Sequence, residues 1–330
     1  MIKVAKIGWK LQKNYVTITL LILISVAIVF MVSLYYSRSR AGVIKPLNNV
    51  WFNPPSFLFS IYGEKEGMLQ DPLSVAAAPD GKIFVADVGA KDIKVFDDKG
   101  KYLFKFFKLG NSGKLLSPLG LAISGGTVYV TDSTHNQIYQ FDLEGNFKGA
   151  FISQNTKKKL IAFTPVGIEV TPSNIYFTDI LFHRVVETDF SGNLIKTIGS
   201  PGNKEGQLAY PDDIAVSPNG KIYVSDANNF RVQVSEDGQQ FKIFGSNNSE
   251  TSVVGSLVRG IAVDNNNYVW ISDALDHKII IVNKNGELVY LIGQTESVQE
   301  NLSYPEGINV SNNRVYIADR GNHRIQVYRR

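Results

Sequence analysis

The sequence predicts an all-β fold, a six-bladed β-propeller closed by its own N-terminal strand. A pattern of about 46 residues occurs six times, and the aspartates that end its second strand are 45, 47, 47, 47 and 46 residues apart. The sixth copy stops at Arg330 after its third strand, and a segment like the missing fourth strand precedes the first copy, at 57–63. A chain that supplies the final strand of its last repeat from its first strand closes a ring.

The second strand of each copy is apolar on both faces and ends in an aspartate. An aromatic residue stands three positions earlier, for example Tyr223 before Asp226, as expected when neighbouring blades cover both faces of the strand. We expect these aspartates to be structural rather than a functional ring of carboxylates, because each blade needs the same hydrogen bonds at this point. They are Asp87, Asp132, Asp179, Asp226, Asp273 and Asp319.

Two further signals bound the strands of each copy. A proline opens five of the six copies, where a strand start needs no ladder donor, and the fifth copy has Val258 instead. Turns with glycine, such as Asp98-Lys99-Gly100, join the third strand to the fourth. Each copy therefore predicts one four-stranded blade.

The sixth and fourth copies resemble the NHL repeat. Ile317 to Val327 reads Ile-Ala-Asp-Arg-Gly-Asn-His-Arg-Ile-Gln-Val, and Tyr223 to Val234 is a second close copy, whereas the other four copies are looser. The chain is similar to NHL-repeat propellers over residues 57–330. The resemblance implies a disc that serves as an interaction platform or an extracellular sensor domain, and it names no ligand.

The segment ahead of the propeller predicts a membrane anchor. Residues 14–37 contain no charged residue and are rich in Ile, Leu, Val and Phe, which is long enough for a helix to cross the bilayer core. Four lysines precede this stretch, and Arg38, Arg40 and Lys45 follow it. A cleavable signal peptide is the alternative, but the apolar stretch is long for one and no small-residue cleavage site closes it.

The anchor predicts the organisation and location of the chain. Residues 1–13 would form a short basic cytoplasmic head, 14–37 the single transmembrane helix, a signal anchor, and 38–56 a tether stiffened by prolines. The propeller, 57–330, would then lie outside the cytoplasmic membrane, with the N-terminus inside. The lipid bilayer is one expected partner, and a protein of the membrane or cell envelope is the other.

Charge and cysteine content exclude several classes. The formal charge of the chain is +4, but residues 1–45 hold seven of its 34 basic residues and no acidic one, so the remainder carries −3. A disc at −3 gives no electrostatic reason to expect nucleic acid. The absence of cysteine excludes disulfides and the RING zinc site of animal ubiquitin ligases with NHL repeats. The run Lys157-Lys158-Lys159 is expected in a solvated loop between blades 2 and 3.

No metal or other cofactor is expected. The four histidines each follow a repeat aspartate by three or four positions, at the turn where the NHL motif itself carries histidine, and each belongs to a different blade. We expect them to be structural; they are His135, His183, His277 and His323. The segment Asp264-Asn265-Asn266-Asn267 resembles a calcium loop only loosely and is expected to be a hairpin turn.

Departures from the repeat mark a candidate partner-binding face where the chain enters the inner strands. Three blades are apolar there and the next three are charged, which predicts a two-toned surface around the central channel. Such a surface suits an asymmetric partner, and ordinary surface variation is the alternative. The residues are Leu73, Leu119 and Val166 on one side, and Asp212, Asp213, Arg259 and Glu306 on the other.

Two polar residues stand deeper in the predicted channel. Glu169 and Asn309 occupy an inner-strand position at which the other four copies have alanine. A carboxylate this close to the axis either lines a wet channel or pairs with a neighbour. Glu169 is therefore the best single candidate for contact with a polar ligand.

The function predicted from these features is a membrane-tethered, extracytoplasmic binding platform without catalytic activity. The alternative is a metal-dependent hydrolase or lyase with its site in the channel. Peptide-amidating lyases of this shape use histidines in the loops that enter the inner strands, and this chain has none there. Sugar-lactone hydrolases use Glu, Asn and Asp around a metal; Glu169 and Asn309 would supply two of these, without an evident complete set.

Overall fold

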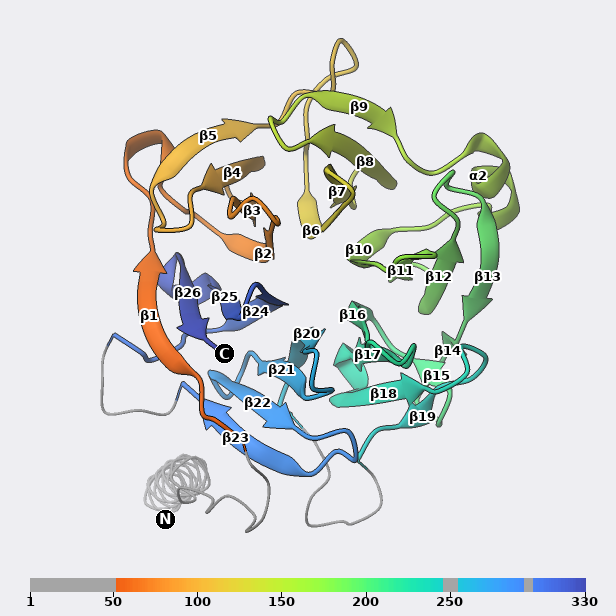
Figure 1. Ribbon diagram of the computed structural model, residues 1–330. Helices are drawn as coiled ribbons and strands as arrows, with labels where there is room; N and C mark the ends of the chain where they lie inside the picture. The colour runs from red at the N-terminus through yellow and green to blue at the C-terminus, as the bar shows by residue number, and fades with distance from the viewer. Residues whose placement is uncertain (1–51, 246–254, 294–298) are drawn as a thin grey trace, which may run out of the picture. The chain divides into compact units, whose positions relative to one another are not determined.

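The computed structural model describes residues 52–245, 255–293 and 299–330, and these form a ring of six four-stranded antiparallel sheets (Figure 1). The predicted all-β, six-bladed propeller is confirmed. The transmembrane helix predicted at 14–37 lies outside the described residues, and no helix within the described ranges is long and apolar enough to span a bilayer.

Each blade runs outward from an inner strand at the channel. Blade 1 is β2 (Pro72–Ala77), β3 (Ile83–Asp87), β4 (Asp92–Phe96) and β5 (Tyr102–Phe106). Blade 2 is β6 (Pro118–Ser124), β7 (Thr127–Asp132), β8 (Gln137–Asp142) and β9 (Phe147–Ala150). Blade 3 is β10 (Pro165–Val170), β11 (Ile175–Asp179), β12 (Arg184–Thr188) and β13 (Leu194–Ile198).

The second half of the ring repeats this order. Blade 4 is β16 (Pro211–Val216), β17 (Ile222–Asp226), β18 (Arg231–Ser235) and β19 (Lys242–Ile243). Blade 5 is β20 (Val258–Val263), β21 (Val269–Asp273), β22 (Lys278–Val282) and β23 (Leu288–Ile292). Blade 6 is β24 (Pro305–Ser311), β25 (Arg314–Asp319) and β26 (Arg324–Arg329), with β1 (Ser56–Ile61) as its outer strand.

The ring closes as predicted. Strand β1 pairs antiparallel with β26 in a register that places Ser56 opposite Arg329 and Ile61 opposite Ile325. Phe52, ahead of this strand, packs edge-on against Tyr268 with ring centroids 5.0 Å apart. The described propeller packing therefore begins a few residues before β1.

Apolar side chains fill the spaces between blades. The aromatic residue three positions before each repeat aspartate is buried in all six blades, and Phe84 and Trp270 have no exposed surface. Ala76 and Phe84 of blade 1 share one core cluster with Leu121 and Val128 of blade 2. Each blade is stabilised by its neighbours because neither face of its second strand is left in contact with water.

The repeat aspartates fix the loops that lead to the channel. All six are fully buried, and each accepts hydrogen bonds from backbone N–H groups of the loop that enters its own blade. Asp87, for example, accepts from Gln70 N at 2.9 Å and from Asp71 N at 2.8 Å. A basic side chain of the third strand pairs with it, Lys94 at 2.6 Å. The inner strands thus begin from rigidly held positions.

Three histidines join one blade to the next. His183 Nδ1 accepts from Tyr210 N, and His277 Nδ1 accepts from Tyr304 N, both at 2.9 Å. His323 contacts Gln70 O across the closure between blades 6 and 1. His135 instead lies 3.1 Å from Asp132 of its own blade. In the described part of the chain, no group of three or more residues is arranged to hold a metal ion.

The lysine run between blades 2 and 3 is not in a loop, so that prediction is wrong. It lies in a short helix, α2 (Gln154–Leu160), whose N-terminus is capped by Ser153 Oγ accepting from Thr156 N. Thr156 and Leu160 bury one side of the helix, which leaves Lys158 and Lys159 exposed. The hairpin turn expected at 264–267 is present, because Asn267 N donates to Asp264 O between β20 and β21.

Candidate functional site

A cavity of about 220 Å³ opens where the six inner strands begin. All seven residues that the sequence placed on the partner-binding face line this mouth, and Ile180 and Arg320 join them from the turns after two repeat aspartates. The apolar residues come from blades 1 to 3 and the charged ones from blades 4 to 6. The structure thus brings the two predicted halves together around one opening.

Glycines set the width of the mouth. A Cβ at Gly120 would lie within 3.0 Å of Val166 O, and one at Gly260 would lie equally close to Glu306 O. The backbones of blades 2 and 3, and those of blades 5 and 6, therefore approach each other closely at the level of the mouth, one pair in each half of the ring. A side chain at these positions would force the inner strands apart.

Ion pairs hold the charged half of the mouth. Arg259 Nη1 lies 3.4 Å from Asp212 Oδ1, and its Nε lies 4.0 Å from Glu306 Oε2. Arg320 Nη1 donates to Glu306 Oε1 at 3.0 Å and binds Asp71 through both Nε and Nη2. Arg259 Nε is buried and has no hydrogen-bond partner among the described residues. This nitrogen therefore has only the long 4.0 Å approach to Glu306 as compensation for its burial.

Arg320 is a mouth residue that the sequence reasoning missed, and so is its partner Asp71. Arg320 directly follows the last repeat aspartate, a position occupied in the other copies by Val88, Ser133, Ile180, Ala227 and Ala274. A single arginine among small or apolar residues was the signal that would have identified it. Asp71 precedes the first proline, and its bond to Arg320 joins blade 6 to blade 1.

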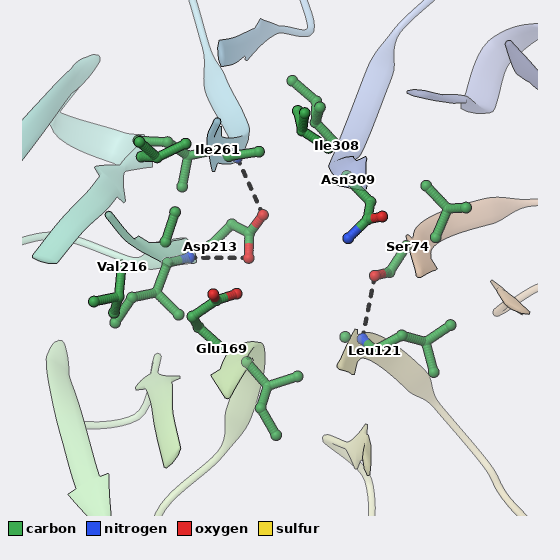
Figure 2. Close-up of a pocket in the computed structure, with 17 residues that line it drawn as sticks. Ser74, Leu121, Glu169, Asp213, Val216, Ile261, Ile308 and Asn309 are labelled. Carbon is green, nitrogen blue, oxygen red and sulfur yellow. Dashed lines mark hydrogen bonds between the residues drawn. The ribbon is translucent and has the colours of Figure 1, made fainter. Parts of the chain in front are cut away.

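A second cavity of about 90 Å³ lies below the mouth. The two share Ser74, Gly120, Asp213 and Gly307 in their walls. Glu169 and Asn309 line the lower cavity, as the sequence predicted, but so does Asp213, whose side chain turns inward (Figure 2). The seven-residue face is therefore divided between two levels.

Hydrogen bonds fix three of the four polar side chains in the lower cavity. Asp213 accepts from its neighbour Ile214 N at 2.9 Å and from Ile261 N of blade 5 at 3.1 Å. Ser74 Oγ accepts from Leu121 N at 3.2 Å, and Asn309 Oδ1 accepts from Ala77 N at 3.3 Å. The Glu169 carboxyl makes no hydrogen bond to the described residues and points into the shared space (Figure 2).

Burial makes these carboxyl groups weak acids. It raises the pKa of Glu169 to about 8, with a further contribution from the charge of Asp213. Burial raises the pKa of Asp213 to about 7 against the opposing effect of its two backbone donors. Glu306 reaches a pKa of about 7 through burial and the charge of Asp212, although Arg259 and Arg320 lower it. The channel would exchange protons near neutral pH.

This arrangement offers two kinds of chemistry. Two carboxyl groups that titrate near neutrality can transfer a proton, and once ionised they can bind a cation. No third His, Cys, Asp or Glu joins them among the described residues, but Asn309 lines the same cavity and could supply a third oxygen ligand. The mouth adds apolar contact and paired charges for a larger ligand.

Comparison with known proteins agrees with the repeat pattern. The family model of the NHL repeat matches residues 208–234 and 302–328, which include the paired second and third strands of blades 4 and 6. The protein brain tumor of Drosophila melanogaster is 32% identical over 97 residues. The matched stretch is 28% of this chain and spans only 9% of that protein's length.

Solved structures share the fold at low sequence identity. Virginiamycin B lyase from Staphylococcus aureus is 16% identical, with 79% of this chain and 95% of that chain covered and a TM-score of 0.56. A gluconolactonase from Xanthomonas campestris is 14% identical, with 87% and 99% covered and a TM-score of 0.60. At these identities the likeness shows the fold alone. The chain therefore carries matched NHL repeats in blades 4 and 6 of a six-bladed β-propeller.

Proposed function

We propose that this propeller is a binding platform whose ligand docks on the mouth of the channel. The observation that carries the proposal is the division of the mouth into an apolar half, Leu73, Leu119 and Val166, and a charged half built on Arg259 and Arg320. An asymmetric ring of this kind orients a bound protein as well as holding it. Ion pairs to Asp212, Glu306 and Asp71 hold the two arginines in place, so the charged half presents a fixed surface to that ligand.

The platform is proposed to be tethered to the cytoplasmic membrane, with the propeller outside. The support is the uncharged segment 14–37 and its flanking basic residues. Confinement to a membrane raises the effective concentration for partners in the same envelope, so a modest affinity suffices. Protease added to intact cells should digest the propeller; a propeller digested only after lysis would contradict this orientation.

The platform is tested by purifying the full chain from its native membrane in mild detergent and quantifying co-purifying proteins by mass spectrometry. The test variant changes Asp212, Arg259 and Glu306 to Ala. The control changes Lys221 and Glu236, an ion pair of 2.7 Å in turns at the opposite end of blade 4. A partner retained by the control and lost from the test variant supports the proposal. A partner retained equally by both rejects the mouth as its site.

A hydrolase or lyase with its site in the channel is the second candidate. It is favoured by the raised pKa values of Glu169 and Asp213 and by propeller relatives that are a lyase and a gluconolactonase. The test is hydrolysis of a panel of lactones, with and without added divalent metal. Turnover that Glu169→Gln abolishes and the exposed-site variant Glu144→Gln preserves would establish it; no turnover would remove it.

A further inference from the structure

The lower cavity holds two acids without a base. Glu169 and Asp213 are the only ionisable residues in its described walls, and the arginines above are already paired with Asp71, Asp212 and Glu306. We propose that this cavity receives the ammonium group of a lysine side chain carried by a protein partner. The inference rests on the proposed binding platform, since that partner must dock on the mouth.

The dimensions of the channel fit a lysine side chain. The lower cavity of about 90 Å³ has room for an ammonium group and a few waters. The mouth cavity of about 220 Å³ directly above it accommodates the aliphatic stem. Their shared walls show that the two cavities adjoin within the channel, with Glu169 in the lower one.

The lower cavity also has the right acceptors. The carboxyl group of Glu169 makes no hydrogen bond to the described residues, and Asp213 keeps lone pairs beyond its two backbone donors. Ser74 Oγ and Asn309 Oδ1 each accept one backbone N–H and keep capacity for another donor. An ammonium group has three donors in a compact head and needs several acceptors of this kind, while a planar guanidinium would need more width.

A cation would also relieve the electrostatic cost of the site. Burial leaves both carboxyl groups largely protonated up to about neutral pH. A buried ammonium supplies the opposite charge that the described walls of the lower cavity lack, so both carboxylates become favourable. The lysine and the acids would therefore stabilise each other's charged forms.

Exposed apolar residues beside the mouth indicate that the lysine belongs to a protein. Five large apolar side chains lie at the same end of the ring as the mouth and are 41% to 51% exposed. They belong to blades 3 to 5, four in the turns after the repeat aspartates and one in a loop that enters an inner strand. We name this set the apolar arc: Leu181, Phe182, Tyr210, Phe230 and Leu275. A free small amine would leave this arc unused, whereas a partner with apolar residues around its lysine would cover it.

The experiment uses the full chain in detergent and a defined probe. The probe is the capped peptide Leu-Phe-Lys-Phe-Leu with a fluorescent label, and its match carries Nε-acetyl-lysine at the centre. Affinity is measured by fluorescence anisotropy at pH 8 for the native chain, Glu169→Gln and the control Glu144→Gln. We expect acetylation to weaken binding at least tenfold and Glu169→Gln to weaken it similarly, while the control binds as the native chain does.

Three outcomes overturn the inference. Equal affinity for both peptides, or no binding of either, shows that the cavity does not select a lysine. Unchanged affinity in Glu169→Gln excludes its carboxyl group. A Phe230→Trp chain whose fluorescence shifts to the blue on transfer from detergent to lipid nanodiscs, without peptide, shows that the apolar arc faces membrane instead.

The inference and the platform can fail separately. If the co-purifying partner is lost from the Asp212, Arg259 and Glu306 variant but kept by Glu169→Gln, the platform stands and the lysine site falls. If neither variant loses it, both fall. Circular dichroism of each variant shows whether it is folded, and the acetyl-lysine comparison does not depend on any variant.

Discussion

The two halves of the mouth share one backbone and differ in chemistry. In blades 1 to 3 the inner strands begin with Leu73, Leu119 and Val166, all partly exposed, and in blades 4 to 6 they begin with charged residues tied by arginines. Glycines bring neighbouring strands together at this level in both halves. The residues that the repeat keeps constant therefore maintain the ring, and the residues that depart from the repeat make the mouth asymmetric.

The largest loss of stability should come from glycine substitutions, and it should be equal in the two halves. Gly120→Ala in the apolar half and Gly260→Ala in the charged half each place a methyl group within 3.0 Å of a neighbouring carbonyl oxygen. Each should lower the free energy of unfolding by about 3 kcal/mol, measured by urea denaturation. Glu144→Gln, at an exposed site, is the control. Tolerance of either change would show that the halves differ in backbone as well.

Replacing Arg259 should affect stability in a way that a change in the apolar half does not. Arg259→Met leaves Asp212 and Glu306 without one positive neighbour, which should destabilise the chain by about 2 kcal/mol at pH 8. The loss should be smaller at pH 5, below the pKa of about 7 for Glu306, because a protonated carboxyl group needs no partner. Leu119→Met in the apolar half should show neither the loss nor the pH dependence. An equal loss of stability from Arg259→Met at both pH values would show that the charge of Glu306 does not cause it.

The carboxyl group of Glu169 should make the chain less stable as the pH rises. The pKa of Glu169 rises from 4.5 to about 8 on folding, so the folded state binds more protons between these values and stability falls as pH rises through this window. Glu169→Gln removes the loss and should stabilise the chain by about 1 to 2 kcal/mol at pH 9, with little effect at pH 4. This is less than the full shift would give, because Glu169 is only partly buried and water screens its charge. Thermal unfolding across pH measures this, with Glu144→Gln as the control; parallel curves for Glu169→Gln and the native chain would refute it.

The smallest effect concerns the bonds between blades. His277→Ala frees Tyr304 N at the start of blade 6, where water can replace the ring nitrogen, so the cost should be about 1 kcal/mol. Urea denaturation checks the value, and His277→Asn, which keeps a side-chain acceptor, should recover part of it. A loss above about 3 kcal/mol would mean that this histidine supports the core and not only a loop.

Periodicity is why so much of the ring and mouth could be predicted. A residue's place in the repeat fixes its blade and its height on the inner strand, which placed Leu73 and Glu306 at one opening although they lie far apart in the chain. The direction in which a side chain points could not be predicted in the same way. All six inner strands have an irregular register just after their first residue, and the third position of the strand holds Asp213 in blade 4, Ser74 in blade 1 and glycine in the other blades. Asp213 lines the lower cavity as well as the mouth, whereas Asp212 lines the mouth alone.

Two other features lay beyond the repeat. Arg320 reaches the mouth from a turn rather than from an inner strand, and its partner Asp71 belongs to another blade. Helix α2 lies in the connection between blades 2 and 3, and no other connection contains an α-helix within its described residues, so the repeat gave no basis for predicting it. The local sequence did favour a helix, because Ser153 is a good N-cap residue. The helix ends at the buried Leu160.

The closing strand sets the order in which the propeller can be completed. Strand β1 emerges from the ribosome before every blade, yet its partner β26 follows all the other described strands, and the bond from Arg324 to Tyr62 spans 262 residues. Until β26 has been synthesised, β1 is an apolar strand with an open edge, the kind of segment that pairs with other chains. Synthesis of β26, rather than the folding of any one earlier blade, is therefore the step that allows the ring to close.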